Sequence, residues 1–288
     1  MKKFQMMALA VAVILPMSCT KDEPAKDDEE LSTTITSQDG WRDVTITFGF
    51  GEGANTRATL QEASLTDLWV FDDDGDGVRM ALHQAAADDG FGSVRLSLKY
   101  GTHALRFVAS RGSDPTFSDG VLSWAKPSDT FWAQMPLEVS PSGAASQQVT
   151  LRRVATRLRI IVTDEIPAEA ATLSVTPSVW YYGLNVLTGE GTDARQTERT
   201  VTIPASYVGT SGQLTASFFG MSPSESWQTD VTVAVKSADG TPIGSVVLEG
   251  VGFAQNVTAS YSGGLLGSAR SVSVDVDDVW GDETTGEW

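Results

Sequence analysis

Apolar and polar residues alternate through most of the chain beyond residue 40, and the spacing typical of helices is almost absent. Examples are VTITFGF at 44–50 and SVSVDV at 271–276. Side chains of a strand point alternately to the two faces of a sheet, so this pattern predicts strands with one buried face. Asp- and Gly-rich turns separate many of the runs, for example at 72–77 and 239–240. We therefore predict an all-β fold of the sandwich type.

The candidate strands are short runs of β-branched and aromatic residues. They cover residues 44–50, 65–71, 78–83, 94–100, 104–110, 135–140, 147–162, 172–184, 200–203, 214–220, 231–236, 245–248, 256–261 and 271–276. Trp69 and Trp180 alternate with apolar neighbours inside two of these runs, which predicts that both side chains belong to a core.

The run 147–162 (QQVTLRRVATRLRIIV) is too long for one ordinary strand of about 5–6 residues. We interpret it as two strands that share a bend. The first part would close an N-terminal sheet by pairing with 135–140, and the part from Val154 onward would open a second domain. The sequence also contains a weak internal repeat, in which VTITFGF and LTDLWVFD resemble LRIIVTD and LSVTPSVWYYG. This repeat supports two domains, at 40–152 and 153–288.

The single cysteine, Cys19, follows an apolar run at 4–17 that is too short to span a bilayer. A basic start, this run and the small Ser18 describe a secretory signal peptide over residues 1–18, cut between Ser18 and Cys19. The segment is similar to a bacterial lipobox, with Leu15 one place further from the cysteine than usual. Acyl chains on Cys19 would tether the protein to a membrane. The alternative is an ordinary secreted protein that is cut elsewhere.

The acidic composition excludes some partners. Residues 19–39 are rich in Lys, Asp, Glu, Pro, Ser and Thr, which predicts a disordered acidic tether. Removal of residues 1–18 takes two lysines from the 20 basic residues and leaves 18 against 37 acidic ones, a net charge of −19. Nucleic acid is therefore excluded as a partner, because it would be repelled. With one cysteine no intramolecular disulfide can form, so stability must come from burial.

Several segments together carry a family resemblance. They are TRATLQEASLTDLWVFDDDGDGV (56–78), YGTHALRFVASRG (100–112), LRRVATRLRIIVTDEIP (151–167), VGFAQNVTASYSGGLL (251–266) and SVSVDVDDVW (271–280). In this order they resemble the fimbrillin-associated anchor family of Gram-negative surface fimbriae. The resemblance implies two tandem transthyretin-like Greek-key β-sandwich domains in a lipoprotein of the cell outer membrane. It further implies surface exposure, fimbrial subunit proteins as partners, and a role in anchoring or regulating a fimbrium.

Arg57 lies in a Gly-rich link, GEGANTRAT, between the first two candidate strands. Related fimbrial shaft subunits are cut at such an arginine, which releases the first strand and opens a groove for a strand donated by a neighbour. The alternative reading of the chain is therefore a polymerising shaft or tip subunit matured by cleavage after Arg57. An anchor would stay uncut, since cleavage separates Cys19 from the fold. The residues that would take part in strand exchange are Val44, Ile46, Phe48, Val272, Val274 and Val276.

The chain offers little material for catalysis or for a cofactor. Its two histidines, His83 and His103, are not accompanied by a nucleophile elbow, and we expect His103 to be a polar turn residue. The segment 72–77 copies the first half of a calcium loop, but position twelve is His83 where a bidentate Glu is required. We predict a turn there, no metal and no enzymatic activity.

Two tryptophans suggest another class of function. Trp124 and Trp132 lie in a segment with Pro, Ser and Asp, LSWAKPSDTFWAQMP, which we interpret as a loop. Their rings could be presented to a sugar or a protein partner, or they could pack in the interior, and the sequence favours neither. A carbohydrate-binding surface lipoprotein therefore remains an alternative to the fimbrial anchor.

Overall fold

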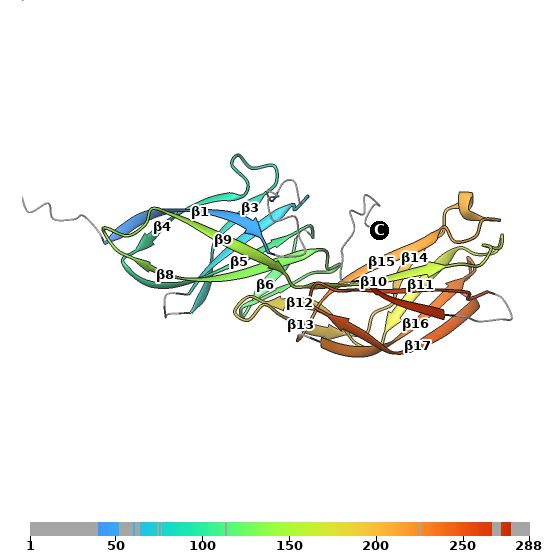
Figure 1. The fold of residues 1–288 in the computed structure, drawn as a ribbon. Coiled ribbons are helices and arrows are strands. Elements are labelled where there is room, and N and C mark those ends of the chain that lie inside the picture. The colour runs from blue at the N-terminus through green and yellow to red at the C-terminus, as the bar shows by residue number, and fades with distance from the viewer. Residues whose placement is uncertain are drawn as a thin grey trace, which may run out of the picture. The chain divides into compact units, whose positions relative to one another are not determined.

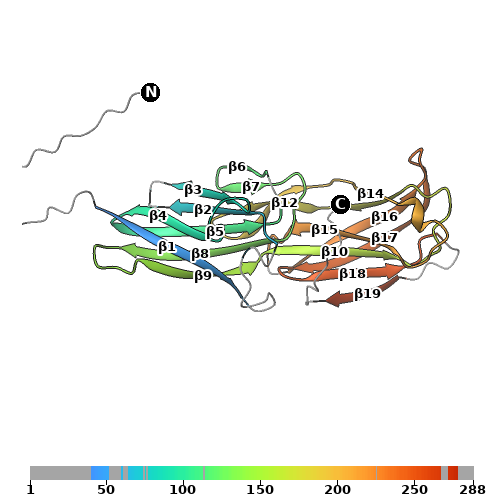
Figure 2. The same ribbon diagram turned by 90° about the horizontal axis from the view of Figure 1, so that it is seen from above.

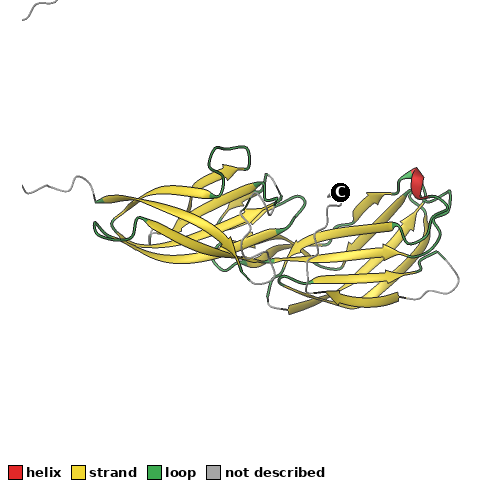
Figure 3. Cartoon of the chain, turned by 45° about the horizontal axis from the view of Figure 1, so that its top comes forward, coloured by secondary structure: helices red, strands yellow, loops and turns green. Residues whose placement is uncertain are grey.

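The computed structural model describes residues 40–51, 60, 64–73, 75, 77–112, 114–224, 226–266 and 272–277. These residues form strands, connected by loops and by one 3-10 turn, η1 (Ala205–Tyr207) (Figure 3). The prediction of an all-β fold with two β regions is confirmed. In the described residues, no helix is long and apolar enough to cross a membrane.

In the described residues, nine strands precede residue 154 and ten follow it. Figure 1 shows these strands in two groups. The first β region contains β1 (Trp41–Phe50), β2 (Asp67–Asp73), β3 (Val78–Ala85), β4 (Ser93–Lys99), β5 (Gly101–Ser110), β6 (Thr116–Ser118), β7 (Val121–Ser123), β8 (Thr130–Val139) and β9 (Ser146–Arg153). The second contains β10 (Ala155–Val162), β11 (Thr172–Pro177), β12 (Trp180–Asn185), β13 (Glu190–Arg195), β14 (Arg199–Thr202), β15 (Leu214–Met221), β16 (Ser226–Lys236), β17 (Pro242–Ala254), β18 (Thr258–Gly263) and β19 (Val272–Asp277).

The first region places strands β4-β1-β9 and β3-β2-β5-β8 on two sides of one core. Strand β1 pairs antiparallel with β4 and parallel with β9. The core between them includes Ile46, Leu68 and Phe107, each fully buried. The expected pairing of β9 with residues 135–140 is wrong in its register. Strands β8 and β9 pair at Phe131–Trp132 instead, because the rest of this hairpin divides between the two layers of strands.

The second region repeats this topology. Its sheets have the orders β15-β10-β18-β19 and β14-β11-β16-β17, and their apolar faces enclose a second core. Strand β10 pairs antiparallel with β15 and parallel with β18, as β1 does with β4 and β9. Strand β19 pairs with β18 at the edge of its sheet (Figure 2). It has no counterpart among the described strands of the first region. The weak internal repeat in the sequence therefore corresponds to the same order of strands in the two regions.

A further sheet contains strands from both regions, in the order β13-β12-β7-β6. Strand β12 pairs with β7 from Gly183 opposite Ser123 to Asn185 opposite Val121. Beside this sheet lies a third apolar cluster, made of Trp69, Phe71, Val108, Leu122, Trp124, Trp132, Val154, Leu184, Val186 and Met221, which we call the junction cluster. The single strand expected at 172–184 is wrong, since it divides at Ser178 into β11 and β12, which belong to different sheets.

The long run at 147–162 forms two strands, as the sequence predicts. The break falls at Val154, which belongs to neither strand and is fully buried in the junction cluster. Its backbone N–H donates to the carbonyl oxygen of Thr130 over 2.9 Å, so the bend is fixed against β8. The exact domain boundary at 152/153 stays a prediction, and the sheet that contains β7 and β12 crosses it.

Candidate functional site

The last described strand, β19, lies at the edge of a sheet and has one described neighbour. It runs antiparallel to β18 from Val272 opposite Gly263 to Asp277 opposite Thr258. Val274 and Val276 pair with Tyr261 and Ala259 in the same register. An edge strand is held to its sheet by one ladder of backbone hydrogen bonds, so it is the type of element that can be exchanged for a strand from another chain.

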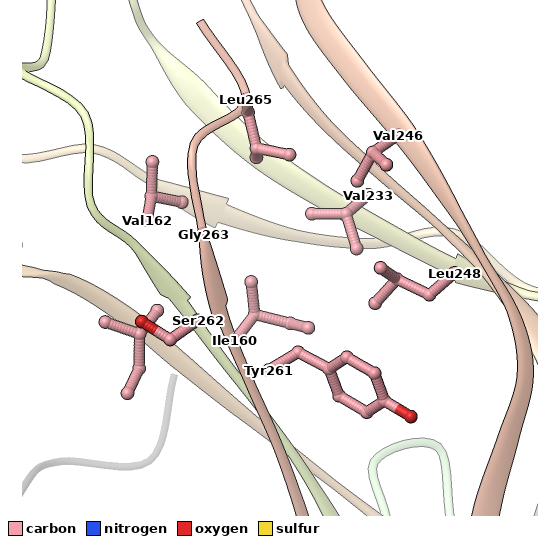
Figure 4. Close-up of a pocket in the computed structure, with 10 residues that line it drawn as sticks. Ile160, Val162, Val233, Val246, Leu248, Tyr261, Ser262, Gly263 and Leu265 are labelled. Atoms are coloured by element: carbon pink, nitrogen blue, oxygen red, sulfur yellow. The ribbon is translucent and has the colours of Figure 1, made fainter. Parts of the chain in front are cut away.

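A narrow apolar cleft opens between the two sheets of the second region, beneath β18 (Figure 4). Its volume is about 20 Å³, which is room for about one water molecule. The lining side chains include Ile160 from β10, Val233 from β16, Leu248 from β17 and Tyr261 from β18. Burial raises the pKa of the Tyr261 hydroxyl, because the phenolate form is poorly solvated there. The lining of the cleft therefore suits apolar side chains and offers few groups that could form hydrogen bonds with a polar side chain.

The segment that leaves β18 toward β19 is fastened to both sheets. The carboxylate of Asp164, just after β10, accepts hydrogen bonds from the backbone N–H groups of Leu265 and Leu266, the latter at 2.9 Å. On the other side, Gly244 in β17 lies so close to the carbonyl of Leu265 that a side chain there would clash. Residue 266 is thus a fixed point from which the chain continues to β19. The role of Asp164 could not be predicted from the sequence, since a lone aspartate after a strand carries no distinctive signal.

Strand β1 holds the other segment named for strand exchange. Val44 and Ile46 are 1% and 0% exposed, and Phe48 packs edge-to-face on Phe107 with ring centroids 5.3 Å apart. Strand β1 is hydrogen-bonded on both sides, to β4 and to β9. Loss of β1 would therefore open a sheet in its centre and expose the first core.

The structure places Trp124 and Trp132 in the interior, so the reading of exposed aromatic platforms is wrong. Trp124 is 1% exposed and its indole N–H donates to the carbonyl of Gly112 over 3.1 Å. Trp132 is 5% exposed, lies in β8 and not in a loop, and donates to the carbonyl of Val186 over 2.8 Å. Both belong to the junction cluster, where packing explains them. The core positions predicted for the other pair, Trp69 and Trp180, are confirmed by their burial.

Both histidines make fixed contacts. His103 is not a turn residue: it lies in β5, is 4% exposed, and is bonded to the carboxylate of Asp72 at 3.0 Å and to the carbonyl of Lys99 at 2.8 Å. Its position follows from the alternation of β5, which turns residue 103 inward with Leu105. His83 lies on β3, bonds Asp67 at 2.8 Å and stacks on Trp69.

Strand β2 extends through the first two residues of the Asp-rich segment 72–77, so the expected turn does not begin at Asp72. Asp72 is 1% exposed and belongs to β2, where it also accepts a hydrogen bond from Arg79 at 3.3 Å. The described residues contain no group of three or more His, Cys, Asp or Glu side chains that could hold a metal ion. Ser18, Cys19 and Arg57 lie outside the described residues.

A family model matches residues 97–287 and is described as a family of unknown function, DUF6562. The chain belongs to this family. No curated protein matches the sequence.

Solved structures from Bacteroidetes share the fold. A candidate cell adhesion protein from Bacteroides ovatus is 14% identical, with a TM-score of 0.50 over 84% of this chain and 99% of that chain. A candidate polysaccharide-binding protein from Bacteroides thetaiotaomicron is 11% identical, with a TM-score of 0.51 over 84% and 99%. The fimbrial anchor protein Mfa2 from Porphyromonas gingivalis is 12% identical, with a TM-score of 0.44 over 83% and 98%. For the first two, at these identities, the likeness is one of fold.

Proposed function

We propose that this protein is a non-enzymatic outer-membrane lipoprotein that anchors surface fimbriae. Acyl chains on Cys19 would hold it in the membrane, and fimbrial subunit proteins would bind to its β-sheets by strand pairing. The observation that carries the proposal is the edge strand β19, which is held to β18 alone in the described chain. Strand β18 itself lines the apolar cleft. A candidate cell adhesion protein with the same type of fold supports it.

The end of β18 suits a joint that opens without unfolding the whole domain. Asp164 and Gly244 fix the chain up to residue 266. Beyond this point β19 could leave its sheet while the core around Ile160 and Leu248 keeps its packing. A strand from a fimbrial subunit would then form the same ladder with β18 that β19 forms now. Truncation after Gly267 tests this joint: a folded protein that no longer retains fimbriae supports it, and an unfolded protein assigns β19 to the core.

The choice between an anchor and a polymerising subunit depends on whether the chain is cut after Arg57. Cleavage after Arg57 would remove Cys19 and also the strand that places Val44 and Ile46 in the first core. An anchor needs both and has reason to remain uncut.

Intact-mass measurement of the protein extracted from membranes tests this choice. A chain that begins at acylated Cys19 is the result expected of an anchor. A chain that begins at Ala58 would contradict the proposal and assign the protein to the shaft or tip of a fimbrium.

The fixed contacts of the histidines support a role without catalysis. His103 is buried between Asp72 and a backbone carbonyl, where a substrate cannot reach it. His83 has one ring nitrogen bonded to Asp67 and its face stacked on Trp69. Binding through backbone pairing needs no titrating side chain, which agrees with a role in assembly.

A further inference from the structure

Strand β9 has an edge that no described strand covers between residues 146 and 151. On one side, Thr45 N–H donates to the carbonyl of Ala145 over 2.8 Å, and Gly51 N–H donates to the carbonyl of Leu151 over 3.0 Å. Backbone groups of successive residues in a strand point alternately to its two sides. The N–H and C=O groups of Gln148 and Thr150 therefore point away from β1. Strand β8 pairs with β9 at Arg152 and Arg153, beyond this stretch.

The corresponding edge in the second region is occupied. Strands β1 and β9 pair parallel, as β10 and β18 do, with Thr45 opposite Ser146 and Arg157 opposite Thr258 at the start of each ladder. In the second region β19 runs antiparallel along the other side of β18. The position beside β18 is therefore occupied by β19. The equivalent position beside β9 holds no described strand.

The edge of β9 also lacks the features by which sheets usually discourage pairing. Proteins protect edge strands with charged side chains, with proline or with a covering segment. Residues 146–151 (SQQVTL) contain neither charge nor proline. By contrast, β4 carries Arg95 and Lys99, and β17 carries Pro242 and Glu249.

Two other described edge strands, β6 and β15, contain no charge or proline. Strand β6 has only three residues, which itself limits pairing, and β15 is covered. The indole N–H of Trp180 donates to the carbonyl of Phe219 in β15 over 2.9 Å. The backbone of Gly191 lies so close to Met221, at the end of β15, that a side chain at Gly191 would clash. Within the part of the chain that the structure describes, residues 146–151 of β9 are therefore an edge of more than three residues that is neither charged nor covered.

We propose that the 146–151 edge of β9 accepts an antiparallel strand from a fimbrial subunit. This inference rests on the proposed anchoring function. Val149 and Leu151 are buried and Gln148 and Thr150 are exposed, so β9 already has one face in the core and one in solvent. The added strand would match this pattern by alternating small apolar residues with serine or acidic residues, as residues 272–277 do in the counterpart position. Arg152, at the end of the edge, lies over the ring of Trp132 at 4.8 Å and donates to the side chain of Gln255, so the partner strand is selected by backbone pairing and side-chain alternation and not by this charge.

Proline at position 148 tests the edge directly. Gln148→Pro removes an N–H that points outward and leaves the ladder with β1 intact, since proline is tolerated where the missing N–H faces away from the sheet. Gln148→Ala is the matched control because it keeps the N–H. Thr150→Pro is a second variant with the same expected effect, in case Gln148→Pro does not fold. The probe is a labelled peptide of residues 271–278, titrated into the full chain.

The wild-type protein and Gln148→Ala are expected to bind the peptide equally, and either proline variant about tenfold more weakly, since one lost hydrogen bond and a steric block together approach 1.4 kcal/mol. Equal binding by all variants, or no binding by the wild-type protein, overturns the inference. Self-association of the wild-type protein that Gln148→Pro abolishes would make a second copy the occupant and overturn the assigned partner.

The same variants in cells separate this inference from the anchoring function. Gln148→Pro should stay in the membrane and retain fewer fimbriae than the wild-type protein, since the joint at β18 is unchanged. If fimbriae stay on cells with Gln148→Pro in wild-type numbers but are released by Cys19→Ala, the edge of β9 is not the acceptor and the anchoring function stands. If Cys19→Ala also leaves fimbriae on the cells, the anchoring function itself fails.

Discussion

The indole N–H of Trp132 donates a hydrogen bond to the backbone carbonyl of Val186 over 2.8 Å. Trp132 belongs to β8 of the first region, and Val186 follows β12 of the second. Both side chains lie in the junction cluster, beside the sheet that joins β7 to β12. The two β regions are thus joined by backbone pairing and by a shared apolar cluster, and a flexible linker alone would provide neither.

Substitutions of Trp132 measure this junction. Trp132→Ala should lower the free energy of unfolding by about 3–5 kcal/mol, because it leaves a cavity where a large buried ring was. Trp132→Phe should lower the free energy of unfolding by about 1 kcal/mol more than the loss of side-chain volume alone would, because the carbonyl of Val186 loses its hydrogen-bond donor. Urea unfolding checks both values.

Trp41→Phe is the matched control for this pair. Trp41 is 53% exposed, so its substitution should change the free energy of unfolding by less than about 0.5 kcal/mol. Two separate unfolding transitions in the wild-type protein would contradict a junction that couples the regions.

The sequence was most informative where strands are long and regularly patterned. Strand β1 and the pair β9 and β10 follow alternation over eight or more residues, and the expected break at the bend falls at Val154. The joining sheet was missed, because three of its four strands give no such signal. Strands β6 and β7 have three residues each, and β13 (EGTDAR) is polar.

Single-residue environments were harder to predict. The sequence around Trp124 and Trp132 has loop composition, and their burial depends on contacts with Gly112 and Val186, far away in the chain. His103 follows a Gly-Thr pair that indicates a turn, yet Gly101 already belongs to β5, and the alternation of that strand turns the ring toward Asp72. These placements come from tertiary pairing, which local composition does not encode.

Asp164 should control how firmly β19 is held. Asp164→Ala removes the acceptor for the N–H groups of Leu265 and Leu266 and should cost about 1.5–3 kcal/mol, as for hydrogen bonds to a charged group. Hydrogen exchange of residues 272–277 should become faster, while exchange in β1 should not change. Glu165→Ala is the matched control, because Glu165 is next to Asp164 in the sequence and accepts neither of these two hydrogen bonds. Unchanged exchange in β19 after Asp164→Ala would contradict the role of residue 266 as a fixed point.

Tyr261 gives a pH dependence with a defined sign. Burial raises the pKa of its hydroxyl in the folded protein, so the folded state holds this proton more tightly than the unfolded chain does. Its contribution to stability is complete below the unfolded pKa of about 10 and is lost as pH rises through the raised folded pKa. Tyr261→Phe should therefore lose less stability than the wild-type protein between neutral and strongly alkaline pH. Equal losses, measured by urea unfolding at each pH, would contradict burial of the hydroxyl beside the cleft.

The central claim is that the protein holds fimbriae to the outer membrane through Cys19. The direct measurement compares cells that carry wild-type protein with cells that carry Cys19→Ala, by assaying the protein and the fimbriae in the membrane fraction and in the medium. We expect the variant to fold as the wild-type protein does, since residue 19 precedes the first strand, and to appear in the medium together with the fimbriae. Variant protein that stays in the membrane fraction, or fimbriae that stay on the cells, would contradict the account.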